Sequence, residues 1–136
     1  MKRVLRSQYL VQHNKDEWFQ LKPDLLIQKD GANKVVLDTK WKLLDSKKAN
    51  GTDKYNLSSS DFYQMLAYAT NYLTTNSGCN GTIILIYPKT KTFDKPLPVF
   101  EFNNLEKIKL WVLPCWLDEG QLLLFTEINL NENIFC

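Results

Sequence analysis

Histidine is nearly absent from this sequence, since His13 is the only one among 136 residues. Catalysis by a Ser-His-Asp or Cys-His arrangement would have to use His13, and a metal site built from several histidines is excluded. The phosphate-binding loops GxxxxGK[ST] and GxGxxG are absent too, which argues against nucleotide hydrolysis on this chain. Carboxylates and lysines are therefore left to carry any chemistry.

Cysteine is also scarce, and Cys79, Cys115 and Cys136 lie far apart without a CxxC spacing. This pattern is typical of buried or incidental thiols in a reducing compartment, not of a disulfide framework or a zinc site. No apolar stretch suits a signal peptide, and none approaches the roughly 20 residues of a membrane span. We therefore expect a cytoplasmic protein that does not associate with membranes.

The sequence lacks a strong excess of either charge, with 17 basic residues, 15 acidic residues and a formal net charge of +2. A nucleic-acid partner would then have to be held by a local basic patch. Apolar residues make up 44% and charged residues 24%, which is ordinary for a globular chain. The length predicts a single domain over residues 1–136.

Apolar patterning predicts three strands, a helix and a fourth strand, which is a β-β-β-α-β order. The predicted strands are residues 7–12, 24–28, 34–40 and 82–87, with a hairpin turn at 29–32 and a helix after the serines at 58–60. The run TIILIY at 82–87 suits a strand buried on both faces. Its crossover from the strand at 34–40 predicts a parallel pair in a mixed sheet. The fold class is therefore α/β, or mixed α+β, with the helix on one face.

The helix has hydroxyl N-caps at residues 58–60 and an acidic residue in its first turn. Helical spacing predicts a core face made of Phe62, Leu66, Ala69 and Leu73. Beyond residue 88 the pattern weakens, although 99–102 and 109–113 are typical of strands. Residues 122–130 fit either a strand or a helix. We therefore predict a core at about 7–88 and a β-rich extension at about 89–136.

Two aspartates and a lysine interrupt the predicted hairpin. Asp24 opens the first strand directly after Pro23, while Asp38 and Lys40 share one face of the second strand because side chains alternate. The two carboxylates can lie opposite or diagonal to each other, with Cβ atoms roughly 5 to 8 Å apart. Such a pair repels unless a cation joins it, and oxygen ligands suit Mg²⁺, with Mn²⁺ as a substitute.

A lysine beside a divalent ion suits phosphodiester hydrolysis, which requires an activated water and a neutralised phosphate. The alternative is that Asp24 caps a turn and that Asp38 and Lys40 form a solvated pair on a surface strand. On the helix, Asp61, Gln64 and Tyr68 form a polar stripe at i, i+3 and i+7. If this stripe faces Asp38, Gln64 can bind a water, a metal ligand or a phosphate; otherwise it faces solvent.

Basic residues follow the second strand of the hairpin. The polar loop there contains Lys42, Lys47, Lys48 and Lys54, which can contact a phosphate backbone without reading its sequence. A second cluster, Lys89, Lys91 and Lys95, follows residue 88. Either cluster can equally be an ordinary solvated loop. The four tryptophans, Trp18, Trp41, Trp111 and Trp116, are more typical of core or interface positions than of base-stacking platforms.

Four segments of the chain together resemble a known family. In order, they are KPDLLI, VVLDTKWK, SSSDFYQMLAYA and LIYP. They are similar to the carboxy-terminal nuclease domain of McrC, the cleavage subunit of the modified-cytosine restriction system, within the PD-(D/E)XK nuclease superfamily. The resemblance covers about residues 8–88. It implies a Mg²⁺-dependent DNA endonuclease and a McrB-like AAA+ GTPase motor as partner.

The resemblance also implies roles for individual residues. The catalytic set would be Asp24, Asp38, Lys40 and Gln64. The metal set would be Asp24, Asp38 and Thr39. DNA would contact Lys42, Lys47, Lys48 and Tyr68.

Two departures from the family pattern shape the alternative interpretations. The superfamily core usually begins with a helix, which is missing here, as is the family's amino-terminal partner-binding region. Without that helix we expect an apolar sheet face to be exposed, which favours a homodimer or association with another chain. The alternatives are a truncated, non-catalytic module that binds DNA or scaffolds a restriction complex, and another nuclease of the same superfamily.

Overall fold

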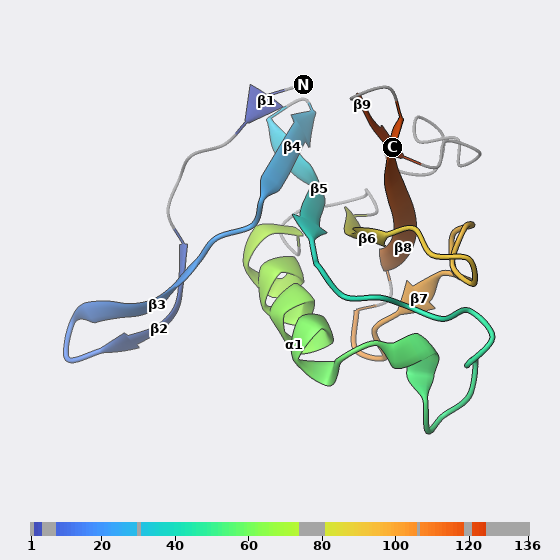
Figure 1. Ribbon diagram of the computed structural model, residues 1–136. Coiled ribbons are helices and arrows are strands. Elements are labelled where there is room, and N and C mark those ends of the chain that lie inside the picture. The colour runs from blue at the N-terminus through green and yellow to red at the C-terminus, as the bar shows by residue number, and fades with distance from the viewer. Residues whose placement is uncertain are drawn as a thin grey trace.

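The computed structural model describes residues 2–3, 8–29, 31–73, 81–105, 107–118 and 121–124. These residues form a mixed α+β fold with one seven-stranded sheet, in the strand order β1-β4-β5-β6-β8-β7, with β9 paired to β8 (Figure 1). The strands of this sheet are β1 (Lys2–Arg3), β4 (Leu25–Lys29), β5 (Ala32–Thr39), β6 (Gly81–Pro88), β7 (Phe100–Glu101), β8 (Ile108–Asp118) and β9 (Gln121–Leu124). None of the described helices is long and apolar enough to cross a membrane.

The β4–β5 hairpin has the predicted antiparallel pairing, and Leu25 lies opposite Leu37. Gly31 in its turn has φ of 79°, a left-handed conformation that glycine adopts without a Cβ clash. Because the strands run antiparallel, the start of β4 meets the end of β5. This geometry brings the first residue before β4 beside the last residues of β5.

The predicted crossover between β5 and β6 is confirmed. The two strands are parallel, with Asp38 opposite Leu85 and Thr39 opposite Ile86. Between them the chain passes through a 3₁₀ turn η1 (Lys54–Asn56), the helix α1 (Ser59–Tyr68) and a π-helical turn η2 (Ala69–Leu73). Residues 81–87 of β6 are all buried, as expected for a strand covered on both faces.

Helix α1 begins as predicted, because the Ser58 side chain accepts a hydrogen bond from the Ser60 N–H. The predicted core face is partly wrong. Phe62 and Leu66 are only half-buried, while Met65 and Tyr68 are 0% and 2% exposed. The tyrosine ring packs inward because its hydroxyl finds a partner there, so a residue assigned to the polar stripe belongs to the core.

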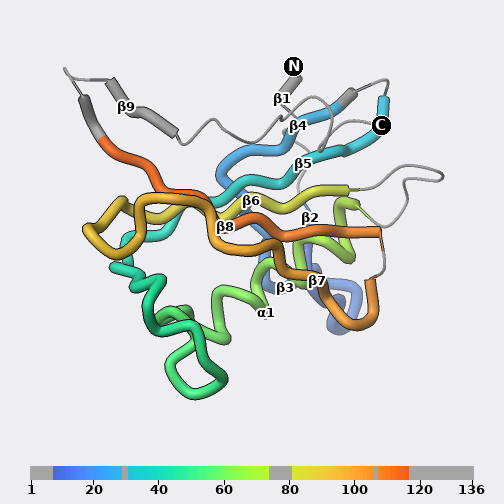
Figure 2. Tube along the Cα trace, turned by 90° about the vertical axis from the view of Figure 1, so that its right-hand side faces the viewer, coloured from blue at the N-terminus to red at the C-terminus, as the bar shows by residue number. Residues whose placement is uncertain are grey.

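Helix α1 covers one face of the sheet (Figure 2). The main core lies between them, where buried side chains of β5, β6 and β8 pack against the helix, among them Val36, Leu85 and Val112. A smaller cluster on the opposite face contains Val35, Ile84, Ile86 and Leu113, which are 0% to 7% exposed. The predicted exposure of an apolar sheet face is therefore not observed at these four positions.

Exposed apolar residues occur instead on a separate hairpin. Among the described residues, strands β2 (Gln8–His13) and β3 (Asp16–Leu21) pair only with each other, and they extend away from the sheet in Figure 1. The strand at 16–21 was not predicted, and no helix precedes β4 among the described residues. The exposed large side chains of this hairpin are Leu10, Val11, Trp18 and Phe19.

Residues of the predicted extension also build the sheet. Strand β8 lies parallel to β6, and β7 and β9 pair antiparallel with β8. The predicted strand at 109–113 is therefore longer, because it covers Ile108–Asp118. Of the ambiguous segment at 122–130, residues 122–124 belong to β9, and 125–130 lie outside the described residues.

Candidate active site

The two aspartates meet at the end of the β4–β5 hairpin. The backbone N–H of Asp24 donates to Oδ1 of Asp38, with 3.2 Å between the atoms. The N–H and the hydroxyl of Thr39 donate to Oδ2 of Asp24 at 2.8 and 2.7 Å. Because the strands pair antiparallel, each carboxylate accepts hydrogen bonds from the other strand's end, and these bonds fix its position.

Lys40 joins this hairpin to the helix. Its Nζ lies 2.9 Å from Oδ2 of Asp38 and also donates to Oε1 of Gln64. The backbone N–H of Lys40 donates to the carbonyl of Ile86 at 2.8 Å, which extends the β5–β6 pairing by one residue. The lysine is therefore fixed at both its backbone and its ammonium group.

Gln64 faces the aspartates, not solvent. While its carbonyl oxygen accepts from Lys40, its Nε2 donates to the hydroxyl of Tyr68 at 2.9 Å. Tyr68 was predicted to contact DNA, but it is 2% exposed and lies behind Gln64. Burial, followed by the charge of Asp38, raises the pKa of the Tyr68 hydroxyl, so this group stays protonated and available as a hydrogen-bond partner.

Two further residues contribute to the cluster and were not predicted as site residues. Oδ1 of Asp61 lies 4.0 Å from Nζ of Lys40, and Oδ2 of Asp61 accepts a hydrogen bond from the Tyr87 hydroxyl at 3.0 Å. Tyr87 is completely buried, and burial together with Asp61 raises its pKa. The sequence signals were the i, i+3 spacing of Asp61 and Gln64 and the place of Tyr87 at the end of β6, beside the end of β5.

Burial affects the two aspartates differently. Burial raises the pKa of Asp38 above its ordinary value, although Lys40 opposes this. Burial also acts to raise the pKa of Asp24, but the hydrogen bonds from Thr39 outweigh it and the pKa is lowered. The surroundings of Asp24 therefore favour its ionised form, whereas those of Asp38 disfavour its ionised form.

The donor set fits a hard divalent cation. No group of three His, Cys, Asp or Glu residues that could hold a metal ion occurs among the described residues. Mg²⁺ usually binds through one or two carboxylates and fills its remaining positions with water and substrate phosphate oxygens. Asp24 and Asp38 supply two carboxylates, and a cation between them would relieve the repulsion that contributes to the raised pKa of Asp38.

The predicted basic residues of the loop are on the surface. Lys42, Lys47 and Lys48 are all exposed. Trp41, which follows the site lysine, is 88% exposed, so it is not a core residue. Of the cysteines, Cys115 is a free thiol whose pKa is raised by burial, while Cys79 and Cys136 lie outside the described residues.

Comparison with known proteins identifies one family. The family described as "McrBC 5-methylcytosine restriction system component" matches residues 2–88, which include β4, β5, α1 and β6 and therefore every residue of the cluster above. No curated protein and no solved structure matches the chain.

Proposed function

The chain belongs to the McrBC 5-methylcytosine restriction system component family, and we propose that it is a Mg²⁺-dependent DNA endonuclease, the McrC-like cleavage component of such a system. One observation carries this proposal. The ammonium group of Lys40 lies within contact of Asp38 on the hairpin and Gln64 on the helix, so residues from β5 and α1 converge beside Asp24. This convergence supports the proposal, because a PD-(D/E)XK nuclease would need these residue types close together.

In this proposal Asp24, Asp38 and an oxygen of Thr39 hold the metal ion. When bound, the ion would neutralise phosphate charge and lower the pKa of a coordinated water. Thr39 orients Asp24 through its two hydrogen bonds, so that carboxylate needs no rearrangement before binding. Asp38 is buried and its pKa is raised, so a neighbouring cation stabilises its charge more than it would stabilise the charge of a solvated carboxylate.

Lys40 supplies the positive charge for the transition state. Its Nζ is held by Asp38 and Gln64, so it can stabilise the negative charge that develops on the phosphate or orient the attacking water. Gln64 is itself fixed by Tyr68, and Asp61 is fixed by Tyr87. These two tyrosines are positioning residues, since they act through the side chains that they hold.

DNA and a McrB-like AAA+ GTPase motor are the proposed partners, and a homodimer is a further candidate assembly. The exposed lysines Lys42, Lys47 and Lys48 follow the site strand and suit the DNA backbone. The non-catalytic scaffold interpretation keeps one supporting observation. The hairpin supplies two carboxylates, Asp24 and Asp38, and the described residues contain no group of three His, Cys, Asp or Glu residues that could hold a metal ion.

Calorimetric titration of Mn²⁺ separates the two interpretations, because metal affinity belongs to this chain and requires no partner. We expect saturable binding to the wild type and no binding to Asp38→Ala. Ser46→Ala, an exposed position on the loop, is the matched control and should bind as the wild type does. Absence of binding in the wild type would overturn the nuclease proposal and leave the scaffold.

A further inference from the structure

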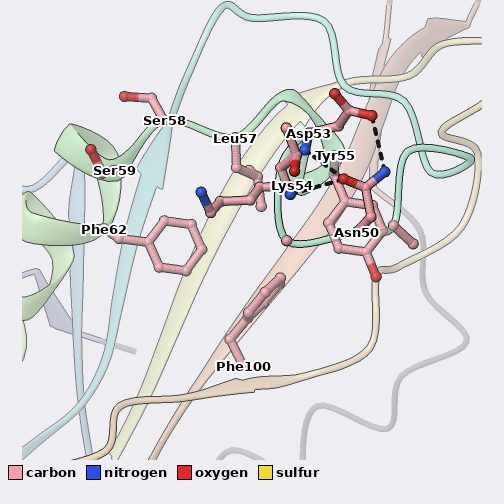
Figure 3. A pocket seen from close by; sticks show the side chains of 12 residues that line it. Asn50, Asp53, Lys54, Tyr55, Leu57, Ser58, Ser59, Phe62 and Phe100 are labelled. Atoms are coloured by element: carbon pink, nitrogen blue, oxygen red, sulfur yellow. Dashed lines mark hydrogen bonds between the residues drawn. The ribbon is translucent and has the colours of Figure 1, made fainter.

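A hollow is lined in part by helix α1, which also carries Asp61 and Gln64 of the candidate active site, and it takes no part in the chemistry proposed above. Its volume is about 640 Å³, and it is lined by residues 49–55 of the loop, by residues 57–59, and by Phe62 and Phe100 (Figure 3). This volume is within the range of about 300 to 1,000 Å³ that is usual for small-ligand sites. We propose that the hollow binds an unpaired nucleobase of the DNA strand whose phosphate lies at Lys40; this inference rests on the proposed function.

Three aromatic rings of the hollow, those of Tyr55, Phe62 and Phe100, could stack against a flat ligand. The ring centroids of Phe62 and Phe100 lie 5.2 Å apart and those of Tyr55 and Phe100 lie 6.3 Å apart, both edge to face. Edge-to-face packing holds the rings in place without stacking them face to face, which leaves ring surface for a base. All three are half-buried against the core, so the walls are formed before a ligand arrives.

The loop that carries Tyr55 has an unusual conformation. Lys54, Tyr55 and Asn56 all have positive φ, of 49°, 58° and 68°. Non-glycine residues adopt this conformation at an energetic cost, and such residues are concentrated at functional sites. The conformation is held by hydrogen bonds from the Lys54 N–H to the Asn50 carbonyl and from the Tyr55 N–H to the Lys48 carbonyl, each 2.9 Å long.

The hollow combines aromatic and basic groups in the way that single-stranded nucleic acids require. Lys54 and Asp53 both line it. The carboxylate of Asp53 accepts a hydrogen bond from Nδ2 of Asn50 at 2.9 Å, and in Figure 3 the Lys54 side chain extends toward the ring of Phe62. The exposed Lys47 and Lys48 lie in the same loop, so phosphates on either side of a bound base would meet positive charge. A neutral apolar peptide would gain nothing from these lysines, which favours nucleic acid as the ligand.

The position of the hollow relates it to the candidate site. Phe62 directly follows Asp61, whose carboxylate lies 4.0 Å from Nζ of Lys40. A residue that lines the hollow is therefore next in sequence to one whose carboxylate is close to the group proposed to act on the phosphate. A strand with its phosphate at Lys40 can place a nearby base in the hollow, provided that this base is unpaired.

The test uses the full chain in metal-free buffer and a short single-stranded DNA that carries 2-aminopurine, a base whose fluorescence falls when it stacks. We expect the fluorescence to fall on binding to the wild type. Phe62→Leu and Tyr55→Leu should each bind about tenfold more weakly, because they remove a stacking surface. Tyr63→Leu is the control, since Tyr63 is the neighbouring aromatic residue on α1 and is 71% exposed.

An abasic version of the oligonucleotide completes the test. It should bind the wild type about tenfold more weakly than the intact strand, and Phe62→Leu should cause no further loss. Equal binding of the intact and abasic strands, or equal losses in Phe62→Leu and Tyr63→Leu, would overturn the inference and leave a protein partner as the ligand class. Thermal melting checks the fold of each variant, and Tyr55→Leu replaces Phe62→Leu if the latter fails to fold. Because neither metal nor cleavage is involved, failure here is distinct from failure to bind Mn²⁺.

Discussion

Lys40 is the residue at which the hairpin and the helix meet, and replacing it separates metal binding from catalysis. Lys40→Met retains the length of the side chain and removes its charge. We expect the rate of plasmid cleavage in Mn²⁺ to fall by about 10² to 10⁴, while calorimetric Mn²⁺ binding remains. Lys107→Met is the control, because Lys107 is an exposed lysine whose carbonyl accepts from the Gly81 N–H, at the end of β6 opposite the site. Loss of Mn²⁺ binding in Lys40→Met would show that the lysine only supports the carboxylates.

Asp38 makes the stability of the metal-free protein depend on pH in an unusual direction. Its folded pKa is raised by burial above 3.8, the value expected in the unfolded chain. The contribution of Asp38 to the free energy of unfolding is therefore fully present below that value and decreases as the pH rises through the folded pKa. Asp24 has a lowered pKa, so its contribution is present above 3.8 and is lost as the pH falls through its folded pKa.

The Asp38→Asn variant has no ionisable side chain at this position. Its free energy of unfolding therefore lacks the pH dependence that Asp38 causes. We expect the stability of the variant relative to the wild type to improve as the pH rises from about 4 to about 7. Urea unfolding at several pH values, without divalent ions, measures this difference. A difference that is constant with pH would contradict the raised pKa. Asp94→Asn is the control, because Asp94 is an exposed aspartate away from the site.

At the scale of the element, the β5–α1–β6 crossover was predictable because its signals are local. Apolar runs, the serine cap and the Gly31 turn are each determined within a few residues, and the handedness of crossovers restricts the rest. The inward packing of Tyr68 was not predictable from periodicity, since a tyrosine can be read as polar or apolar. The role of Asp61 depends on Tyr87, which lies 26 residues away.

The second strand of the β2–β3 hairpin was missed for a related reason. Its residues, DEWFQL, have no clean alternation, and most of them are exposed on both faces. A strand that packs against no core carries no pattern that burial would impose. The site residues of β4, β5 and α1, in contrast, were predictable because polar residues stand out within buried elements.

Side chains are buried in β5 and exposed in the β2–β3 hairpin, and this difference can be measured as a difference in stability. Val36 in β5 is 0% exposed and packs in the cluster beneath α1, while Val11 in β2 is 44% exposed. Val36→Ala should lower the free energy of unfolding by about 2 kcal/mol. Val11→Ala should change it by less than about 0.5 kcal/mol. Urea unfolding of both variants checks this, and equal losses would mean that the hairpin is part of the cooperative core.

At the scale of the whole molecule, the near balance of charge limits how DNA can be bound. With a formal net charge of +2, the protein has no general attraction for a polyanion. Affinity must come from lysines that lie close enough to the site to contact phosphates. The exposed Lys47 and Lys48 satisfy this condition, because their loop connects the site strand β5 to α1, which carries Gln64.

The salt dependence of duplex DNA binding counts these contacts. Each phosphate neutralised contributes about −0.9 to the slope of log K against log salt concentration. Replacing both Lys47 and Lys48 by Gln should therefore make the slope shallower by about 2 and weaken binding equally for all sequences. Replacing Lys91 and Lys95 by Gln removes the same charge from the second exposed cluster and should leave the slope unchanged. If both double variants shift the slope equally, DNA responds to the net charge alone and does not bind along the loop between β5 and α1.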